Sequence, residues 1–196
     1  MFQITISNGY ATVAQFQIRT GLTDAQTLNK TALIELEIEN NSRIIDQVTS
    51  NIFYEKTLTA SKAIFNFGTN ADGLRMSENA QRVYFPGDIL TLTTVLSEGD
   101  TLTEDEDYYA STNFIESDGI FSTTRDNAVK ITGTCGSATT PGDVNSICLA
   151  MSEVTTGLGT YTMIDSSGSK TDVTRDNIPD WVFNQLNHRV RYDSYG

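Results

Sequence analysis

The sequence predicts an α+β protein, in which a small helical bundle carries an antiparallel β-rich insertion between its long helix and its two C-terminal helices. Three observations predict this class. Apolar residues recur at helical spacing near both ends of the chain, and short β-prone runs separated by turn signals fill the middle. The connections between these runs are too short for βαβ crossovers, which favours antiparallel pairing.

The length of 196 residues suits a single domain, residues 1–196. Within it we expect N-terminal helices at 1–54 and the β-rich insertion at 55–136. A helix with a polar connection is expected at 137–178, and a C-terminal helix with a tail at 179–196.

Two helices are predicted near the N-terminus. Residues 1–8 are expected to form a short strand or an ordered arm, after which Thr12 is placed to cap a short helix that Gly21 ends. The longest helix is predicted from Asp24 to about Asn51.

The long helix is predicted despite an alternation of apolar and acidic residues at 33–39 that is typical of a strand. The helical stripe decides the prediction because it continues for several further turns, through Ile34, Ile38, Ile44, Ile45, Val48 and Ile52. Leu36 lies outside this stripe. Contact with a neighbouring subunit and simple exposure to solvent both account for that position.

The β-rich middle consists of β-prone runs at 82–85, 89–96, 108–109, 113–116 and 128–132. Turn signals containing glycine lie between them, at 70–73, 86–88, 98–100 and 117–119. In the longest run, Leu90, Leu92 and Val95 are predicted to form one inward face, with threonines on the other face.

The last two helices follow. Asp143 is predicted to cap a helix that runs to about Val154, with the apolar stripe Val144, Ile147, Cys148, Met151 and Val154. Residues 160–177 are expected to be a polar connection with a flexible centre at 166–169. Pro179 suits the first turn of the final helix, in which Val182, Leu186 and Val190 repeat every four residues.

The composition limits the function classes. A net charge of −12, from 13 basic and 25 acidic residues, argues against tight binding of a nucleic-acid backbone. The charge serves solubility, or it lets a duplex pass without adhering. No signal sequence or membrane-spanning run is recognised, so no membrane partner is expected. Cys135 and Cys148 form no disulfide or metal framework, and reduced, buried thiols are expected.

Catalytic signatures are missing from the sequence: it has no phosphate loop, no HExxH, no GxSxG and no calcium loop. A thiol–histidine pair of Cys135 and His188 is conceivable, but nothing near Cys135 in the sequence would lower its pKa. We therefore expect no enzyme, no catalytic residue, no metal and no cofactor. His188 is interpreted as a surface or interface residue.

The acidic run Glu104, Asp105, Glu106 and Asp107 is the strongest charge feature. It lacks the glycine and the spacing of a calcium loop, so a solvated hairpin tip is favoured, and a hairpin facing a partner or a channel is the alternative. A glycosidase pair of Asp105 and Asp107 would need an aromatic sugar platform, which the sequence does not indicate.

The C-terminal segment combines aromatic and cationic residues that dominate protein interfaces: Trp181, Phe183, Arg189, Arg191, Tyr192 and Tyr195. Trp181 and Phe183 could equally dock the last helix on its own domain. The tail from Tyr192 to Gly196 is too short to form a core, so we expect it to bind a partner.

The order of these segments resembles the head–tail connector, or adaptor, family of tailed bacteriophages. The resemblance covers nearly the whole chain. It rests on the order of several short motifs, found at 10–24, 33–34 with 42–49, 83–87, 99–108, 131–136, 141–144 and Pro179. Two places depart from the family pattern: Thr49-Ser50-Asn51 stands where Thr-Gly-Arg is usual, and the segment 155–177 is longer and more polar.

The resemblance implies a structural virion protein of the neck, made in the host cytoplasm. Such a protein forms a homo-oligomeric ring, usually a dodecamer, under the portal. The ring extends the DNA channel, helps retain the packaged genome until ejection, and offers a platform to tail or stopper proteins. The C-terminal residues from Asp180 would then reach the portal protein, and double-stranded DNA would pass without tight binding.

A ring contact needs two different surfaces on each subunit, and we expect Leu36, with Ile34 and Ile38, to belong to one of them and the β-rich insertion to the other. Three alternatives remain open. They are another virion part, such as a tail-completion or capsid-associated protein, a small thiol or carboxylate hydrolase, and a β-rich carbohydrate-binding module.

Overall fold

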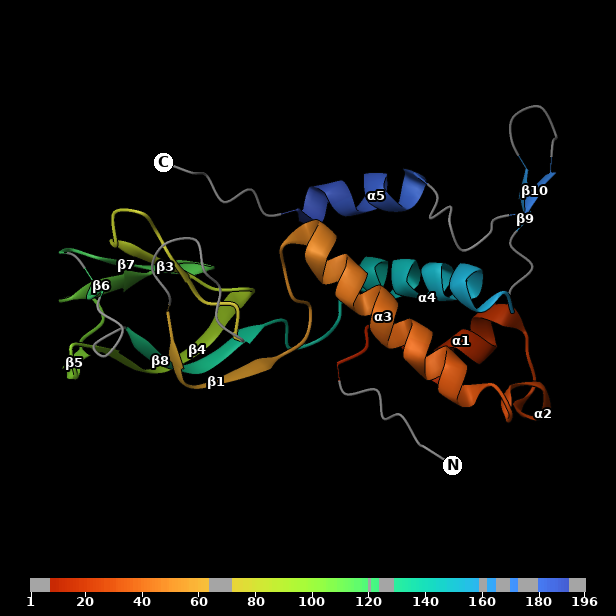
Figure 1. Ribbon diagram of the computed structural model, residues 1–196, viewed down its shortest axis with the longest axis horizontal. Helices are drawn as coiled ribbons and strands as arrows, with labels where there is room; N and C mark the ends of the chain where they lie inside the picture. Colours follow the sequence, from red (N-terminus) through yellow and green to blue (C-terminus); the bar gives the residue numbers. More distant parts are fainter. Residues whose placement is uncertain are drawn as a thin grey trace. The chain divides into compact units, whose positions relative to one another are not determined.

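The computed structural model describes residues 8–63, 72–119, 121–123, 129–158, 162–164, 170–172 and 180–190, with the backbone alone at 162–164, 170–172, 180, 181 and 183. The chain forms two compact units: residues 1–51 with 140–196, and residues 52–139. The first unit is mainly helical and the second contains two antiparallel sheets, so the α+β class is confirmed (Figure 1).

The first helix, α1 (Val13–Thr20), begins and ends as predicted. The Thr12 side chain accepts a hydrogen bond from Gln15 N, and the Gln15 side chain accepts one from Thr12 N, which completes a capping box. Gly21 ends the helix with a φ of 68°. A residue with a side chain would be strained in this left-handed conformation.

The predicted single helix from Asp24 is wrong, because the chain forms α2 (Asp24–Thr27) and α3 (Thr31–Thr49). Thr23 and Gln26 form a capping box around α2 that fixes this short helix locally. Lys30, with a φ of −120° and a ψ of −2°, then interrupts the helical backbone before α3 starts. The apolar stripe gives no sign of this interruption, because Lys30 precedes Ile34, the first residue of the stripe.

The α3 stripe packs inward as predicted at Ile34, Ile38 and Ile45, which are fully buried. Ile44 and Val48 are half-buried, and Ile52 belongs to the core of the other unit. Ser50, with a φ of 50°, ends the helix at Thr49.

Helix α4 (Gly142–Thr156) packs along α3 in the helical unit (Figure 1). All five residues of its predicted apolar stripe are buried. The prediction that Asp143 caps this helix is wrong. Pro141 occupies that position without a side-chain hydrogen bond, and Asp143 lies within the first turn, where its carboxylate faces the positive end of the helix dipole.

The predicted polar connection after α4 contains two strands, β9 (Thr162–Ile164) and β10 (Lys170–Asp172), which pair antiparallel. Only short β-prone stretches, such as Thr-Met-Ile, mark them in the sequence. The last helix, α5 (Asp180–Leu186), continues as a 3-10 turn, η1 (Asn187–Arg189). Val182 and Leu186 are buried, which confirms its apolar side. Residues 1–7 and Pro179 lie outside the described residues.

The β-rich unit contains two four-stranded antiparallel sheets. The first has the order β1 (Lys56–Lys62), β8 (Lys130–Gly136), β4 (Asp88–Ser97) and β5 (Asp100–Leu102). The second has the order β2 (Arg75–Met76), β3 (Arg82–Tyr84), β7 (Phe114–Ser117) and β6 (Tyr108–Ala110). The β-prone runs correspond to β3, β4, β6, β7 and β8. Strands β1, β2 and β5 were not predicted.

The core of this unit takes side chains from both sheets, including Leu58, Val83, Val95, Ile115 and Ile131. The predicted inward position of Leu90 is wrong, since its side chain is 38% exposed. Pairing of β4 with β8 shifts register between Ile89 and Thr91, and again between Leu92 and Thr94. Leu92 and Val95 contact the core as predicted, and the bulges change the alternation so that Ile89 contacts the core in place of Leu90.

Strand β8 runs very close to its neighbours at two glycines. A Cβ atom on Gly133 would lie 2.2 Å from Thr91 O, and one on Gly136 would lie 1.9 Å from Tyr54 O. Gly136 also has a φ of 107°. The glycines of the predicted Thr-Gly-x-x-Gly segment are therefore required by packing of the backbone.

Candidate interaction surfaces

The C-terminal helix is fastened to the helical unit by an ion-pair cluster, which we call the α5 latch, formed by Asp143, His188 and Arg189. Arg189 donates from Nε to Asp143 Oδ2 over 3.0 Å and from Nη2 to Oδ1 over 3.1 Å. His188 Nε2 lies 3.2 Å from the same Oδ2 atom. The bidentate geometry is specific to a guanidinium, so the latch fixes where α5 ends relative to α4.

The latch affects the acid–base behaviour of Asp143. Partial burial alone would raise the pKa of this carboxyl group, but the hydrogen bonds and charge of Arg189 outweigh burial and lower the pKa below its usual value. The ionised carboxylate is therefore the form that the folded state favours.

We expect docking of α5 to weaken in acid. Because the folded-state pKa of Asp143 is depressed, its stabilisation is present above the unfolded value of about 3.9 and is lost as pH falls through the lower folded value. Trp181 is the only tryptophan and lies on α5, so its fluorescence between about pH 6 and pH 2 reports the change. Asp143→Asn should remove this pH dependence, and Glu104→Gln should keep it. A wild-type profile in Asp143→Asn would contradict the expectation.

Helices α3 and α4 meet through polar as well as apolar contacts. Asn41 Nδ2 donates to Ser152 Oγ over 3.2 Å and to Thr155 Oγ1 over 3.1 Å. A salt bridge of 2.8 Å between Arg19 Nε and Glu153 Oε1 ties α1 to α4. These bonds select one register of the helices.

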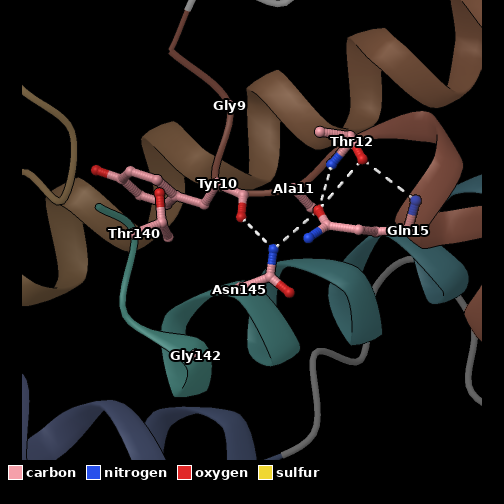
Figure 2. Close-up of a pocket in the computed structure, with 8 residues that line it drawn as sticks. All are labelled: Gly9, Tyr10, Ala11, Thr12, Gln15, Thr140, Gly142 and Asn145. Carbon is pink, nitrogen blue, oxygen red and sulfur yellow. Dashed lines mark hydrogen bonds between the residues drawn. The ribbon is translucent and has the colours of Figure 1, made fainter. Parts of the chain in front are cut away.

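A hollow of about 360 Å³ lies where the segment before α1 crosses the start of α4 (Figure 2). Asn145 Nδ2 donates to Tyr10 O over 2.6 Å and to Gln15 Oε1 over 3.1 Å. Gln15 Oε1 also accepts from Thr12 N. Among the described side chains that line the hollow, no buried polar atom lacks a partner. The arrangement thus braces α1 against α4 and does not point to a ligand.

Large aliphatic side chains on the helices are exposed, and we call them the aliphatic surface. Ile18 on α1 is 83% exposed and Leu28, before α3, is 67% exposed, while Leu33 and Leu36 on α3 are 42% and 40% exposed. Leu33 and Leu36 lie three residues apart and share one face of α3. Ile34 and Ile38 are fully buried, so Leu36 alone of the three predicted lateral residues is open to a neighbour.

The acidic run lies on the surface of the β-rich unit, with Glu104, Asp105, Glu106 and Asp107 all exposed. It differs from the expected hairpin because β5 pairs with β4, whereas β6 pairs with β7 in the other sheet. We call residues 103–107 the acidic loop. Asp107 Oδ2 accepts from Thr103 N over 2.8 Å and shapes it. No group of three metal-binding side chains occurs in the described part of the chain.

The sheet β2-β3-β7-β6 has an outer face that the sequence reading missed. Arg75, Tyr84 and Phe114 are paired across neighbouring strands in one row, and Arg82, Glu116 and Tyr109 are paired in the next. We call these six residues the arginine face. The alternation Arg82-Val83-Tyr84 could have indicated this outer face, because Val83 is buried and its two neighbours point to the other side of the strand.

The two thiols are poor candidates for nucleophiles. Cys135 and Cys148 are buried thiols that are not joined in a disulfide. Burial, partly offset by Ser42 and Ser152, raises the pKa of Cys148 to about 11. A protonated thiol without contact to solvent does not attack a substrate. His188, the other member of the conceivable pair, instead lies beside Asp143.

The residues predicted to bind the portal are only partly described. Arg189 belongs to the latch, and the backbone of Trp181 and Phe183 lies in α5, with Val182 between them buried. Arg191, Tyr192 and Tyr195 lie outside the described residues.

The helices of the described ranges include none that is long and apolar enough to cross a bilayer. In comparisons with known proteins, no protein-family model matches the chain, and no curated protein matches its sequence.

Proposed function

We propose that this chain is a structural part of a tailed phage virion, a head–tail connector that forms a ring under the portal and carries the DNA channel towards the tail. The observation that carries the proposal is the aliphatic surface. The helical unit exposes four large aliphatic side chains, and the two that share one face of α3 offer adjacent apolar area that another protein can bury.

The α5 latch supports the predicted role of the tail. It holds Arg189 against Asp143, so the residues that follow start from a fixed point on the helical unit. A short segment that starts from a fixed point loses less conformational freedom when it binds than a free peptide would. The tail contains Arg191, Tyr192 and Tyr195, which are residue types that contribute strongly at interfaces.

The charge distribution supports a channel that does not hold its cargo. A net charge of −12 repels a duplex, and exposed carboxylates such as those of the acidic loop add to this repulsion locally. Such a connector would guide DNA by the shape of its channel, and its tight contacts would be with other proteins.

Removing the tail tests the proposal. Deletion of residues 191–196 should abolish binding to the portal protein encoded in the same genome while the free energy of unfolding stays within about 0.5 kcal/mol of the wild type. The helix must be kept, since a deletion from residue 181 would also remove the buried Val182 and Leu186. Binding is measured by co-sedimentation with portal rings.

The double variant Tyr192→Ala/Tyr195→Ala keeps the length of the tail and should weaken portal binding by at least about tenfold. Full portal binding by both the truncated chain and this variant would refute the role of the tail. A wild-type chain that neither forms rings nor binds the portal would refute the proposed function itself.

A further inference from the structure

The arginine face is built from cation–aromatic pairs that hold its side chains in place. The Arg75 guanidinium carbon lies 5.4 Å from the ring centre of Tyr84, and that of Arg82 lies 5.0 Å from the ring centre of Phe114. The two rings are 5.9 Å apart. The opposite side of the same strands carries the buried Val83 and Ile115, so this row lies on the outside of the sheet.

The pairs decide which ligands the face suits. Guanidinium groups cover one face each of Tyr84 and Phe114, which reduces the aromatic surface on which a sugar would stack. Arg82 Nη2 is 3.1 Å from Glu116 Oε1, and a guanidinium has five N–H donors, so it can serve a second carboxylate as well. The face therefore suits an acidic protein surface.

The same unit carries an acidic surface at the other edge of this sheet. The strand order β2-β3-β7-β6 puts Arg75 and Arg82 on the first two strands, and the acidic loop leads directly into β6 at the far edge. One compact unit thus carries two guanidinium groups towards one edge of this sheet, beside Glu78 and Glu116, and the acidic loop at the other edge. Such an arrangement allows the acidic loop of one copy to meet the guanidinium groups of the next, which is the geometry of a head-to-tail contact.

We propose that the arginine face binds the acidic loop of a second copy of this chain, so that the β-rich units follow one another around the ring. This inference rests on the proposed function, and it names the surfaces that make one lateral contact. The occupant is assigned by charge complementarity: the chain has almost twice as many acidic as basic residues, and the acidic loop holds its densest exposed group of carboxylates.

The other cationic pair in the unit serves as a matched control. Lys62 and Lys130 are paired across β1 and β8 in the other sheet, on the side of Thr132 and Thr134. Both are flexible ammonium groups, which make less directional contacts than guanidinium groups. Reversing their charge changes the net charge of the chain as much as reversing Arg75 and Arg82.

A charge-swap experiment tests the contact with three full-length variants. The face variant is Arg75→Glu/Arg82→Glu, the loop variant is Glu104→Arg/Glu106→Arg, and the control is Lys62→Glu/Lys130→Glu. Asp105 and Asp107 are left unchanged because Asp105 has a φ of 68° and Asp107 shapes the loop. Self-association is measured by analytical ultracentrifugation, and folding by far-ultraviolet circular dichroism.

We expect the face variant and the loop variant each to lose self-association by at least about tenfold, while the control assembles like the wild type. An equimolar mixture of the face and loop variants should assemble again, because every contact in an alternating ring then joins opposite charges. Recovery in the mixture also shows that both variants are folded. Association of the wild type should weaken as salt is raised, since exposed charges are screened.

Three outcomes would overturn the inference. The first is a wild-type chain that forms rings while the face and loop variants do so equally well; it leaves the proposed function intact. The second is a face variant that keeps self-association but loses binding to the portal or a stopper protein, which assigns the face to another partner. The third is a pair of variants that fail alone and also fail when mixed.

Discussion

Replacement of Gly136 by alanine is expected to destabilise the β-rich unit by at least about 3 kcal/mol, a large share of the free energy of unfolding of a domain of ordinary stability. The added Cβ atom would lie 1.9 Å from Tyr54 O, and the residue would keep a φ of 107° that L side chains rarely adopt. The neighbouring atom is backbone, so no side chain can move aside. The clash can be relieved only if β8 moves away from the segment before β1.

The measurement is thermal and urea unfolding followed by circular dichroism, with hydrogen exchange of the β8 amides to show which unit has opened. Gly142→Ala is the matched control. Gly142 is the first residue of α4, and an added Cβ would have no neighbouring atom within 4 Å. The free energy of unfolding of the Gly142→Ala chain should therefore rise by up to about 1 kcal/mol. Equal stability of the Gly136→Ala and wild-type chains would show that this close approach is absent.

Ile38→Ala is expected to reduce the free energy of unfolding by about 2 to 5 kcal/mol, whereas Leu36→Ala should change it by less than about 0.5 kcal/mol. The two positions are two apart on α3, with one residue between them. Ile38 is fully buried and its truncation leaves a cavity, while Leu36 is 40% exposed. Unfolding of the isolated chain in urea gives both values.

The two substitutions should affect the proposed ring formation differently from stability. Leu36→Ala removes part of the aliphatic surface and should weaken ring formation without loss of fold. Ile38→Ala should weaken it only to the extent that the helical unit unfolds. If Leu36→Ala assembled as tightly as the wild type at every concentration, α3 would not belong to the lateral contact.

The helices were predictable because a helix that packs on one side repeats its apolar residues in the sequence. Val144 to Val154 at intervals of three and four placed α4 correctly, and Thr12 and Gly21 gave the bounds of α1. The break between α2 and α3 was not predictable from this periodicity, because Lys30 leaves the helical conformation at a position with no apolar residue. The short strand β2 was missed because two residues carry too little periodicity.

The candidate surfaces depend on contacts between distant parts of the chain, and local patterns do not record these. Asp143 was interpreted as a helix cap, and only the fold shows that Arg189 approaches it from the last helix. The acidic run was correctly expected to be exposed. Its position between two sheets follows from the pairing of β5 with β4 and of β6 with β7, which the run itself does not encode.

The two ends of the β-rich unit are neighbours, because Ser137 N donates to Tyr54 O over 3.3 Å. A segment whose ends lie side by side can be cut out and bridged by a short linker without stretching the chain that remains. Residues 52–139 are therefore organised as an exchangeable cassette. This arrangement allows the segment to be exchanged for another module while the helices are kept.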